Sequence, residues 1–279
     1  MQEKTVKFEV LMAVMHQKDF SIAYKTKVKS DLLIINQCDE EKYEEIEVDG
    51  HTWRMIYTKE RGSHFSRQMA LDNARGEICL FCDDDEVYVD DYVDIVLNAY
   101  KELPKASAIV FNVKRINYKM KKTYYTITKK RLAPRYRAYA TSMLSIKLAD
   151  IRKKGVRMSE IFGSGSVWGG GEDSLFESDI RNSGLKLYEY PSEIATVDYG
   201  GGSAWFNGYT EKYFYNLGAF IQYKYKWNFI LKELRCLFTC YRLRREKTLS
   251  VFKKMKWMHK GMKGIKKGIT YPEYIKAKE

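Results

Sequence analysis

Apolar runs alternate with more polar segments through the first 113 residues of the chain. Short, continuous runs rich in branched and aromatic residues predict buried strands. Such runs cover Phe8 to Met15, Asp31 to Gln37, Thr52 to Tyr57, Ile78 to Cys82 and Ala108 to Val113. Between the first four runs, helices are expected at Ser21 to Ser30 and at Gly62 to Gly76. The order βαβαβαβ predicts an α/β fold with a mostly parallel central sheet flanked by helices.

The run from Ile78 to Cys82 stops at four consecutive acids, Asp83 to Glu86. In an open α/β sheet, ligands bind in the crevice at the carboxyl ends of the strands. Closely spaced carboxylates repel one another unless a cation offsets their charge, and their oxygens suit Mg²⁺ or Mn²⁺. The run therefore predicts a metal site that holds a diphosphate. The alternative is that these acids cap a helix formed by Val87 to Leu103, since acids favour helix N-termini.

A second pair of acids follows a glycine-rich stretch, Phe162-Gly-Ser-Gly-Ser-Val-Trp-Gly-Gly-Gly-Glu-Asp173. Glycines allow the backbone to approach a ligand closely, and Glu172 and Asp173 open an expected helix that runs to about Ser183. A carboxylate at such a junction is well placed to act as a general base on a substrate hydroxyl. The alternative is an ordinary glycine-rich loop followed by acidic helix capping.

The two acidic stretches together resemble the family 2 glycosyltransferases with the GT-A fold. Asp83-Asp84-Asp85 is followed, about ninety residues later, by Trp168-Gly-Gly-Gly-Glu-Asp173. The segment from Gly62 to Gly76 is similar to that family's Gly-Leu-Ser-x-Ser-Arg-Asn helix, with Arg67 at the arginine position and Gln68 in place of the asparagine. The resemblance covers about residues 8–215 and implies a GT-A, Rossmann-like fold.

The resemblance implies a donor and metal half of the site. Asp85 would bind a divalent metal, Mn²⁺ or Mg²⁺, that bridges the two phosphates of the donor. Asp83 would reach the nucleotide ribose or the metal shell. Asp84 would lie with them on the donor side. The order of the strands also predicts that Arg61 and Arg67 lie close to this strand end, where they could meet a phosphate. The alternative is that both are ordinary surface arginines.

Two further acids are implied at the edges of this half. Asp39 resembles the acid that contacts the nucleobase, with Asn36 or Gln37 as alternatives. Many relatives have a histidine that completes the metal shell, but this sequence has none between His64 and His259. Asp198 is the expected substitute, and water is the alternative.

The resemblance implies that catalysis depends on the other acidic stretch. Asp173 matches the catalytic base, Glu172 would position the acceptor or the backbone, and Trp168 with its neighbouring glycines would shape the acceptor pocket. One base on the face opposite the leaving group gives a single displacement with inversion.

The implied enzyme is a metal-dependent, inverting glycosyltransferase. It would move a sugar from a nucleotide-diphosphate sugar, expected to be a UDP-sugar, to a hydroxyl of a glycan or lipid-linked saccharide, as in cell-surface polysaccharide synthesis. One alternative is a non-catalytic module that binds nucleotide-sugar or nucleic acid, which Asp85 and Asp173 argue against. The other is a sugar nucleotidyltransferase, but Met15 to Asp19 lacks the glycine-rich loop expected after its first strand.

The formal charge of +13 is concentrated near the C-terminus. Residues 1–223 hold 32 basic and 32 acidic residues, whereas residues 224–279 hold 17 basic and 4 acidic ones. We expect a catalytic domain at 1–209, with a nucleotide-sugar half at 1–112 and an acceptor half at 113–209. A basic, amphipathic helical region is expected at 210–279.

An apolar stripe with helical spacing marks this basic region, at Trp227, Ile230, Leu234, Leu237 and Tyr241. The stripe favours packing on the catalytic domain. The alternative is binding to an anionic membrane surface, because aromatic residues beside basic ones suit that interface.

A basic, tyrosine-rich segment from Lys114 to Arg137 includes an expected hairpin arm at Lys122 to Thr128. It contains no recognised nucleic-acid motif, so nucleic acid is not an expected partner. The sequence from Met1 to Phe8 lacks signal-peptide features, and no apolar run is long enough to span a membrane. We therefore expect a cytoplasmic protein, or one peripheral on the cytoplasmic membrane face.

Overall fold

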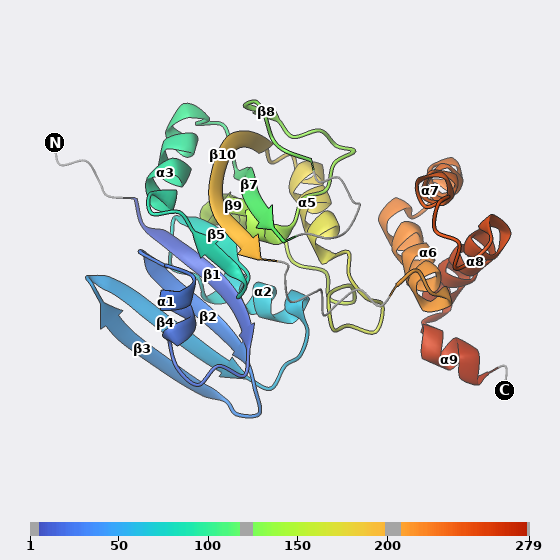
Figure 1. Ribbon diagram of the computed structural model, residues 1–279, viewed down its shortest axis with the longest axis horizontal. Coiled ribbons are helices and arrows are strands. Elements are labelled where there is room, and N and C mark those ends of the chain that lie inside the picture. The colour runs from blue at the N-terminus through green and yellow to red at the C-terminus, as the bar shows by residue number, and fades with distance from the viewer. Residues whose placement is uncertain (1–5, 118–124, 199–207, 278–279) are drawn as a thin grey trace. The chain divides into compact units, whose positions relative to one another are not determined.

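The computed structural model describes residues 6–117, 125–198 and 208–277. The chain forms two compact units. The first contains residues 1–160 and 172–202, and the second contains residues 161–171 and 203–279. The first unit is built on the sheet and the second on helices (Figure 1).

The amino-terminal half of the sheet is parallel, as predicted. Its strands run in the order β4-β2-β1-β5. They cover β1 (Phe8–Met15), β2 (Asp31–Gln37), β4 (His51–Thr58) and β5 (Ile78–Cys82). Helices α1 (Ser21–Lys25) and α2 (Ser63–Asn73) connect them. Because the strands are parallel, the segments that follow Gln37, Thr58 and Cys82 all leave the same edge of the sheet.

One edge strand was not predicted. The strand β3 (Lys42–Val48) pairs antiparallel with β4 and lies at the end of the sheet. Asp49 and Gly50 join the two strands with φ of 51° and 79°, which is the left-handed backbone that a tight hairpin requires. The strand is largely exposed and rich in glutamate, so it lacks the apolar run that marks the buried strands.

The second half of the sheet is mixed. The strands β7 (Ala108–Ile116) and β10 (Leu187–Asp198) pair in parallel. The strand β9 (Leu144–Lys147) runs antiparallel between β5 and β7, and the short strands β6 (Glu86–Tyr88) and β8 (Arg131–Leu132) pair antiparallel with β10. Three helices, α3 (Tyr92–Glu102), α4 (Leu148–Lys153) and α5 (Glu172–Asn182), and the 3₁₀ helix η1 (Thr141–Met143) complete this half.

Some predicted boundaries in this half were wrong. The acids at 83–86 do not cap a helix, because β6 follows them and α3 begins only at Tyr92. The expected hairpin arm lies partly outside the described residues, and its described part, 125–128, has no regular secondary structure.

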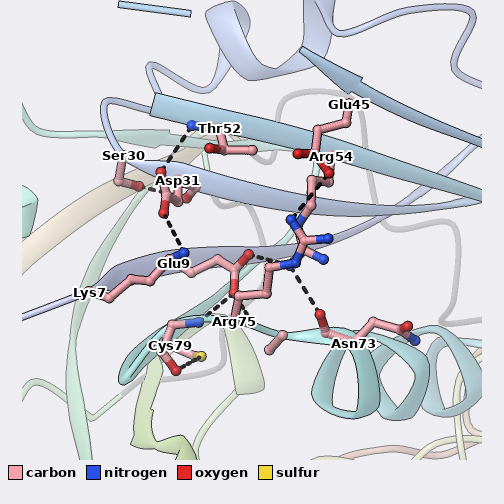
Figure 2. A network of polar contacts seen from close by, with 12 residues as sticks. Lys7, Glu9, Ser30, Asp31, Glu45, Thr52, Arg54, Asn73, Arg75 and Cys79 are labelled. Atoms are coloured by element: carbon pink, nitrogen blue, oxygen red, sulfur yellow. Dashed lines mark hydrogen bonds and ion pairs between the residues drawn. The ribbon is translucent and has the colours of Figure 1, made fainter. Parts of the chain in front are cut away.

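A buried ion pair ties the start of β1 to its neighbours (Figure 2). The Arg54 guanidinium donates to Glu9 over 2.5 Å and to the carbonyl of Asn73 over 3.0 Å. The other Glu9 oxygen accepts from the backbone N–H groups of Arg75 (2.5 Å) and Gly76 (2.8 Å). This network joins β1, β4 and the end of α2, so it fixes α2 on the sheet.

Helices make up the second unit. They are α6 (Glu211–Tyr225), α7 (Phe229–Arg242), α8 (Val251–Lys267) and α9 (Tyr271–Lys276). Helices α6 and α8 approach so closely that a Cβ on Gly218 would lie 1.9 Å from the carbonyl oxygen of Met258. A Cβ on Gly261 would lie 1.8 Å from the carbonyl oxygen of Tyr215. Only glycine fits at these crossing points. Within the described ranges, no helix is long and apolar enough to cross a membrane.

The Glu9 network predicts a large stability effect for Arg54→Met. Removing one partner leaves the Glu9 carboxylate buried without its counter-charge, so we expect a loss of about 3–5 kcal/mol in the free energy of unfolding. Arg75→Met is the control, because its ion pair with Glu45 is exposed to solvent and should contribute little to stability. Urea denaturation measures both, and equal losses in the two variants would contradict the prediction.

Candidate active site

A cluster of charged side chains lies at the carboxyl edge of the sheet in the first unit. Arg67 is at its centre, with 11% of its side chain exposed. Its guanidinium donates to Asp83 over 2.9 Å and to Asp173 over 3.0 Å, and it also contacts Glu172 at 3.4 Å. The structure therefore brings together two acidic stretches that lie far apart in the sequence.

Helix α2 presents Arg67 from its first turns. The backbone N–H of Gly62, just before the helix, donates to the side chain of Gln37 at the end of β2 over 2.8 Å. This bond fixes the start of the helix on the sheet. Ser63 and Arg67 are four residues apart and therefore share one helix face. The Ser63 hydroxyl donates to Glu172 over 2.6 Å, so both side chains hold the start of α5.

Two donors meet the same oxygen, Oδ1, of the Asp173 carboxylate. Arg67 contacts it, and the hydroxyl of Thr141 in η1 also donates to it. The pKa of the Asp173 carboxyl is raised to about 6. Burial is the largest cause, the charge of Arg67 acts against it, and the negative charge of Glu172 adds to it. Burial lowers the pKa of Arg67, but the charges of Asp83, Asp173 and Glu172 outweigh that effect and raise it. Arg67 is therefore a permanent cation beside a carboxyl that titrates near neutral pH.

The turn at 83–85 connects β5 to β6. Asp84 and Asp85 are exposed there. The pKa of each is raised, first by the loss of water around its carboxyl group and then by the charge of Asp83. Behind the turn, Glu86 is buried, and burial followed by the charge of Asp83 raises its pKa well above the usual value. Crowded acids of this kind gain from a bound cation, so the donor set suits Mg²⁺ or Mn²⁺.

The remaining predicted acids lie at the margins of this cluster. Asp39 follows β2, is 90% exposed and pairs with Arg61 over 2.6 Å. Asp198 ends β10, where it accepts a hydrogen bond from Asn117 over 2.9 Å. The antiparallel register pairs Val197 with Glu86, which places Asp198 one residue further, toward Asp85. Throughout residues 6–117, 125–198 and 208–277, no three acids, histidines or cysteines converge closely enough to hold a metal ion.

Trp168 and its glycines belong to the second unit. The Trp168 ring stacks on Tyr215 of α6, with ring centroids 6.3 Å apart. A Cβ on Gly171 would lie 2.6 Å from the ring of Phe220, so this glycine permits close packing on α6. The glycine-rich loop thus has a structural role in its own unit, and its contact with an acceptor stays a prediction.

Two residues of the cluster were not found by sequence reasoning. Ser63 lies in the segment compared with the family's serine-rich helix, so that motif was an available signal for it. Thr141 lies in a 3₁₀ turn between irregular chain and β9, and no local pattern marks it. Only the fold brings its hydroxyl to Asp173.

Comparison with known proteins decides the family. Residues 18–157, half of the chain, match the family described as Glycosyl transferase family 2. The chain belongs to this family. No curated protein matches the sequence.

Solved structures give the same fold for this glycosyltransferase. The crystal structure of S. aureus TarS 1-349 in complex with UDP-GlcNAc aligns with a TM-score of 0.62 at 10% identity, over 95% of this chain and 93% of that chain. The same TarS fragment in complex with UDP gives 0.54 at 11% identity, over 97% and 78% of the two chains. A further TarS structure gives 0.55 at 12% identity, over 88% of this chain and 44% of that chain. The predicted GT-A fold is confirmed.

The expectation that Asp173 is the general base predicts, together with its pKa, how activity depends on pH. A general base works in its deprotonated form, which predominates above the pKa, so kcat/KM should rise with pH up to about 6 and then level off. Below that value it should fall by about tenfold per pH unit. A pH–rate profile of sugar transfer measures this, with donor binding followed over the same range as the control. Full activity down to pH about 4, near the ordinary pKa of an aspartate, would contradict the prediction.

Proposed function

We propose that this glycosyltransferase is a metal-dependent, inverting enzyme that transfers a sugar from a UDP-sugar to a hydroxyl of a glycan or lipid-linked saccharide. The observation that carries the proposal is the Arg67 cluster. The Arg67 guanidinium contacts both Asp83, which follows β5, and Asp173, in the first turn of α5. Donor-binding and acceptor-activating groups would then lie within reach of one sugar.

Asp173 is the proposed base. Its carboxylate takes the proton from the acceptor hydroxyl while the acceptor oxygen forms a bond to the anomeric carbon of the donor. The bond from that carbon to the diphosphate breaks on the opposite face, and the nucleoside diphosphate leaves with the electron pair. A single displacement of this kind inverts the anomeric configuration.

Arg67, Thr141 and Ser63 are proposed to hold the base and its neighbour in place. Arg67 and Thr141 both contact Asp173, which restricts the carboxylate to one orientation. Ser63 and Arg67 hold Glu172, so the first turn of α5 is anchored from the sheet side. Fixed orientation of a base is worth a large share of a rate enhancement, because it removes the entropy cost of alignment.

Asp85 and Asp83 are the proposed metal residues, with Asp198 as a third candidate from the neighbouring strand. A divalent cation held there would stabilise the charge that develops on the departing diphosphate. The crowding of three carboxylates in one turn, Asp83 to Asp85, supports a cation there, because burial and then the charges of neighbouring acids raise the pKa of Asp84 and Asp85. Asp84 would contact the donor from the same turn, and Asp39, beyond β2, is proposed to face the nucleobase.

The choice of donor and acceptor is also a proposal. UDP-GlcNAc is bound in the TarS structure, which supports a UDP-sugar as the first donor to examine. We propose polysaccharide synthesis as the setting, with the enzyme cytoplasmic or peripheral on the cytoplasmic membrane face. A screen of UDP-sugars with Mn²⁺ by thermal shift would find the donor, since a ligand that binds only the folded state raises Tm.

Replacement of the base tests the mechanism. Asp173→Asn keeps the size of the side chain but removes the proton acceptor, so the rate of transfer should fall by about 10²–10⁴-fold. Affinity for the UDP-sugar, measured by calorimetry, should stay close to the original value. Asp179→Asn, an exposed change on the same helix, is the control and should keep full activity. Near-normal turnover in Asp173→Asn would overturn the assignment.

Replacement of a proposed metal residue tests the donor half separately. Asp85→Ala should weaken Mn²⁺-dependent binding of the UDP-sugar by about tenfold or more, because one carboxylate ligand is lost. Asp90→Ala is the matched control, since this exposed acid pairs with Lys29 and lies outside the cluster. Titration of the donor with and without Mn²⁺ measures the effect. An affinity that is unchanged in Asp85→Ala would remove this residue from the metal site.

A further inference from the structure

Helix α7 turns its apolar side outward. Ile230, Leu234, Leu237 and Tyr241 recur at helical spacing on one side, and Leu231 and Phe238 adjoin them. All six side chains are exposed, Leu234 for example by 56% and Ile230 by 69%. We call these six residues the α7 apolar face.

The inward side of the same helix is partly polar. Lys232, Cys236, Thr239 and Cys240 are buried there. The Lys232 ammonium donates to Gln222 and to the carbonyl of Lys226, both over 2.9 Å. Because its polar groups are satisfied inside the unit, α7 is held in this orientation. The apolar face is therefore the side of α7 that points away from the core of its own unit.

A second buried lysine reinforces this arrangement. Lys254 of α8 is 1% exposed and donates to the carbonyls of Leu243 (2.8 Å) and Glu246 (2.7 Å). These carbonyls follow the end of α7, so the lysine binds the chain where it leaves the helix. A buried lysine on the inward side of α7 and six exposed apolar side chains on its outward side reverse the usual pattern of a surface helix.

Further exposed aromatic residues lie close to α7 in the sequence. Trp227, just before the helix, is 96% exposed, and Phe229 is exposed beside it. Phe252, at the start of α8, is 75% exposed. Soluble monomers rarely expose apolar residues in such number within one short segment, so this surface indicates a binding site.

Basic residues accompany the apolar ones. Between residues 226 and 256 there are ten basic and two acidic residues. Seven of the basic side chains are exposed, namely Lys226, Arg242, Arg244, Arg245, Lys247, Lys253 and Lys256. One of the two acids, Glu233, is paired with His259 over 2.9 Å. The Arg244 guanidinium lies 4.3 Å from the ring centre of Tyr241, so cationic and aromatic groups share this surface.

We infer that the α7 apolar face and its basic neighbours bind the surface of an anionic lipid membrane. Apolar side chains with tryptophan and tyrosine enter the boundary between headgroups and acyl chains, while lysine and arginine meet the lipid phosphates. A helix of 14 residues is about 21 Å long, too short to span the bilayer, so α7 would lie in the plane of the interface. The strong positive charge favours this occupant over a second copy of the same basic surface.

Vesicle flotation with the full chain tests the inference. The probe is vesicles of phosphatidylglycerol mixed with phosphatidylcholine, compared with phosphatidylcholine alone. We expect binding to the anionic vesicles at about 0.01 M salt and a marked loss at about 1 M, where the Debye length falls to about 3 Å. No binding to anionic vesicles at low salt would overturn the inference, and so would equal binding to both kinds of vesicle.

Two variants separate the apolar and the charged contributions. Leu234→Glu with Leu237→Glu should reduce vesicle affinity by more than about tenfold, because charges replace inserted apolar groups. Arg244→Ser, Arg245→Ser and Lys247→Ser together should reduce it by about a hundredfold at low salt, at about fivefold per basic residue. Leu132→Ser is the control, since it removes an equally exposed leucine from the first unit. Wild-type affinity in both combined variants would overturn the inference.

Light scattering tests whether a second copy of the chain, instead of a membrane, covers the α7 apolar face. If a second copy covers the α7 apolar face, the wild type will be a dimer that Leu234→Glu with Leu237→Glu dissociates, and vesicle binding will be absent. That result would overturn the inference. Circular dichroism confirms that each variant remains folded. Because the readout is vesicle binding, failure here leaves the proposed sugar transfer untouched, and loss of transfer in Asp173→Asn leaves vesicle binding untouched.

Discussion

The site depends on one cation, Arg67, which offsets the negative charge of three acids. Asp83, Glu172 and Asp173 converge on the same small region, and their mutual repulsion would force them apart or protonate them without a cation. Arg67 supplies that cation permanently, because an arginine does not lose its charge at physiological pH. Its planar guanidinium reaches Asp83 with one nitrogen and both acids of α5 with the other. The carboxyl end of β5 and the start of α5 are joined in this way.

This arrangement gives Arg67 contacts that the sequence did not predict. Its guanidinium pairs with three carboxylates, and its contact with a donor phosphate stays a prediction. A cation shared between the donor acid and the proposed base couples the two halves of the site electrostatically. Any new positive charge beside Asp83 would also change the electrostatic potential at Arg67 and at its partner Asp173. This coupling is a physical reason to treat Arg67 as part of the site.

The two units stabilise their buried charged residues in different ways. In the first unit, the buried carboxylate of Glu9 is paired with the opposite charge of Arg54. In the second, Lys232 and Lys254 are buried against carbonyl and amide oxygens instead. Carbonyls at the end of a helix carry partial negative charge, so they can hold an ammonium group without a carboxylate. Because these two lysines pair with no carboxylate of the described residues, the second unit keeps an excess of basic residues, many of them at its surface.

The sequence alone determined the parallel strands β1, β2, β4 and β5, because each is a short, mainly apolar segment that suits a strand covered on both faces. It also identified Asp83 and Asp173 as separate acids at the ends of elements. It missed β3, since an exposed edge strand needs no apolar run. Only the tertiary structure decided that Arg67, Ser63 and Thr141 meet these acids, because contacts between distant segments leave no local pattern. In α7 the sequence showed the apolar stripe but not whether it faces the core or the solvent. An amphipathic pattern indicates only that one side of a helix is apolar. The hydrogen bonds of the buried Lys232 hold the polar side inward, so the apolar side is exposed.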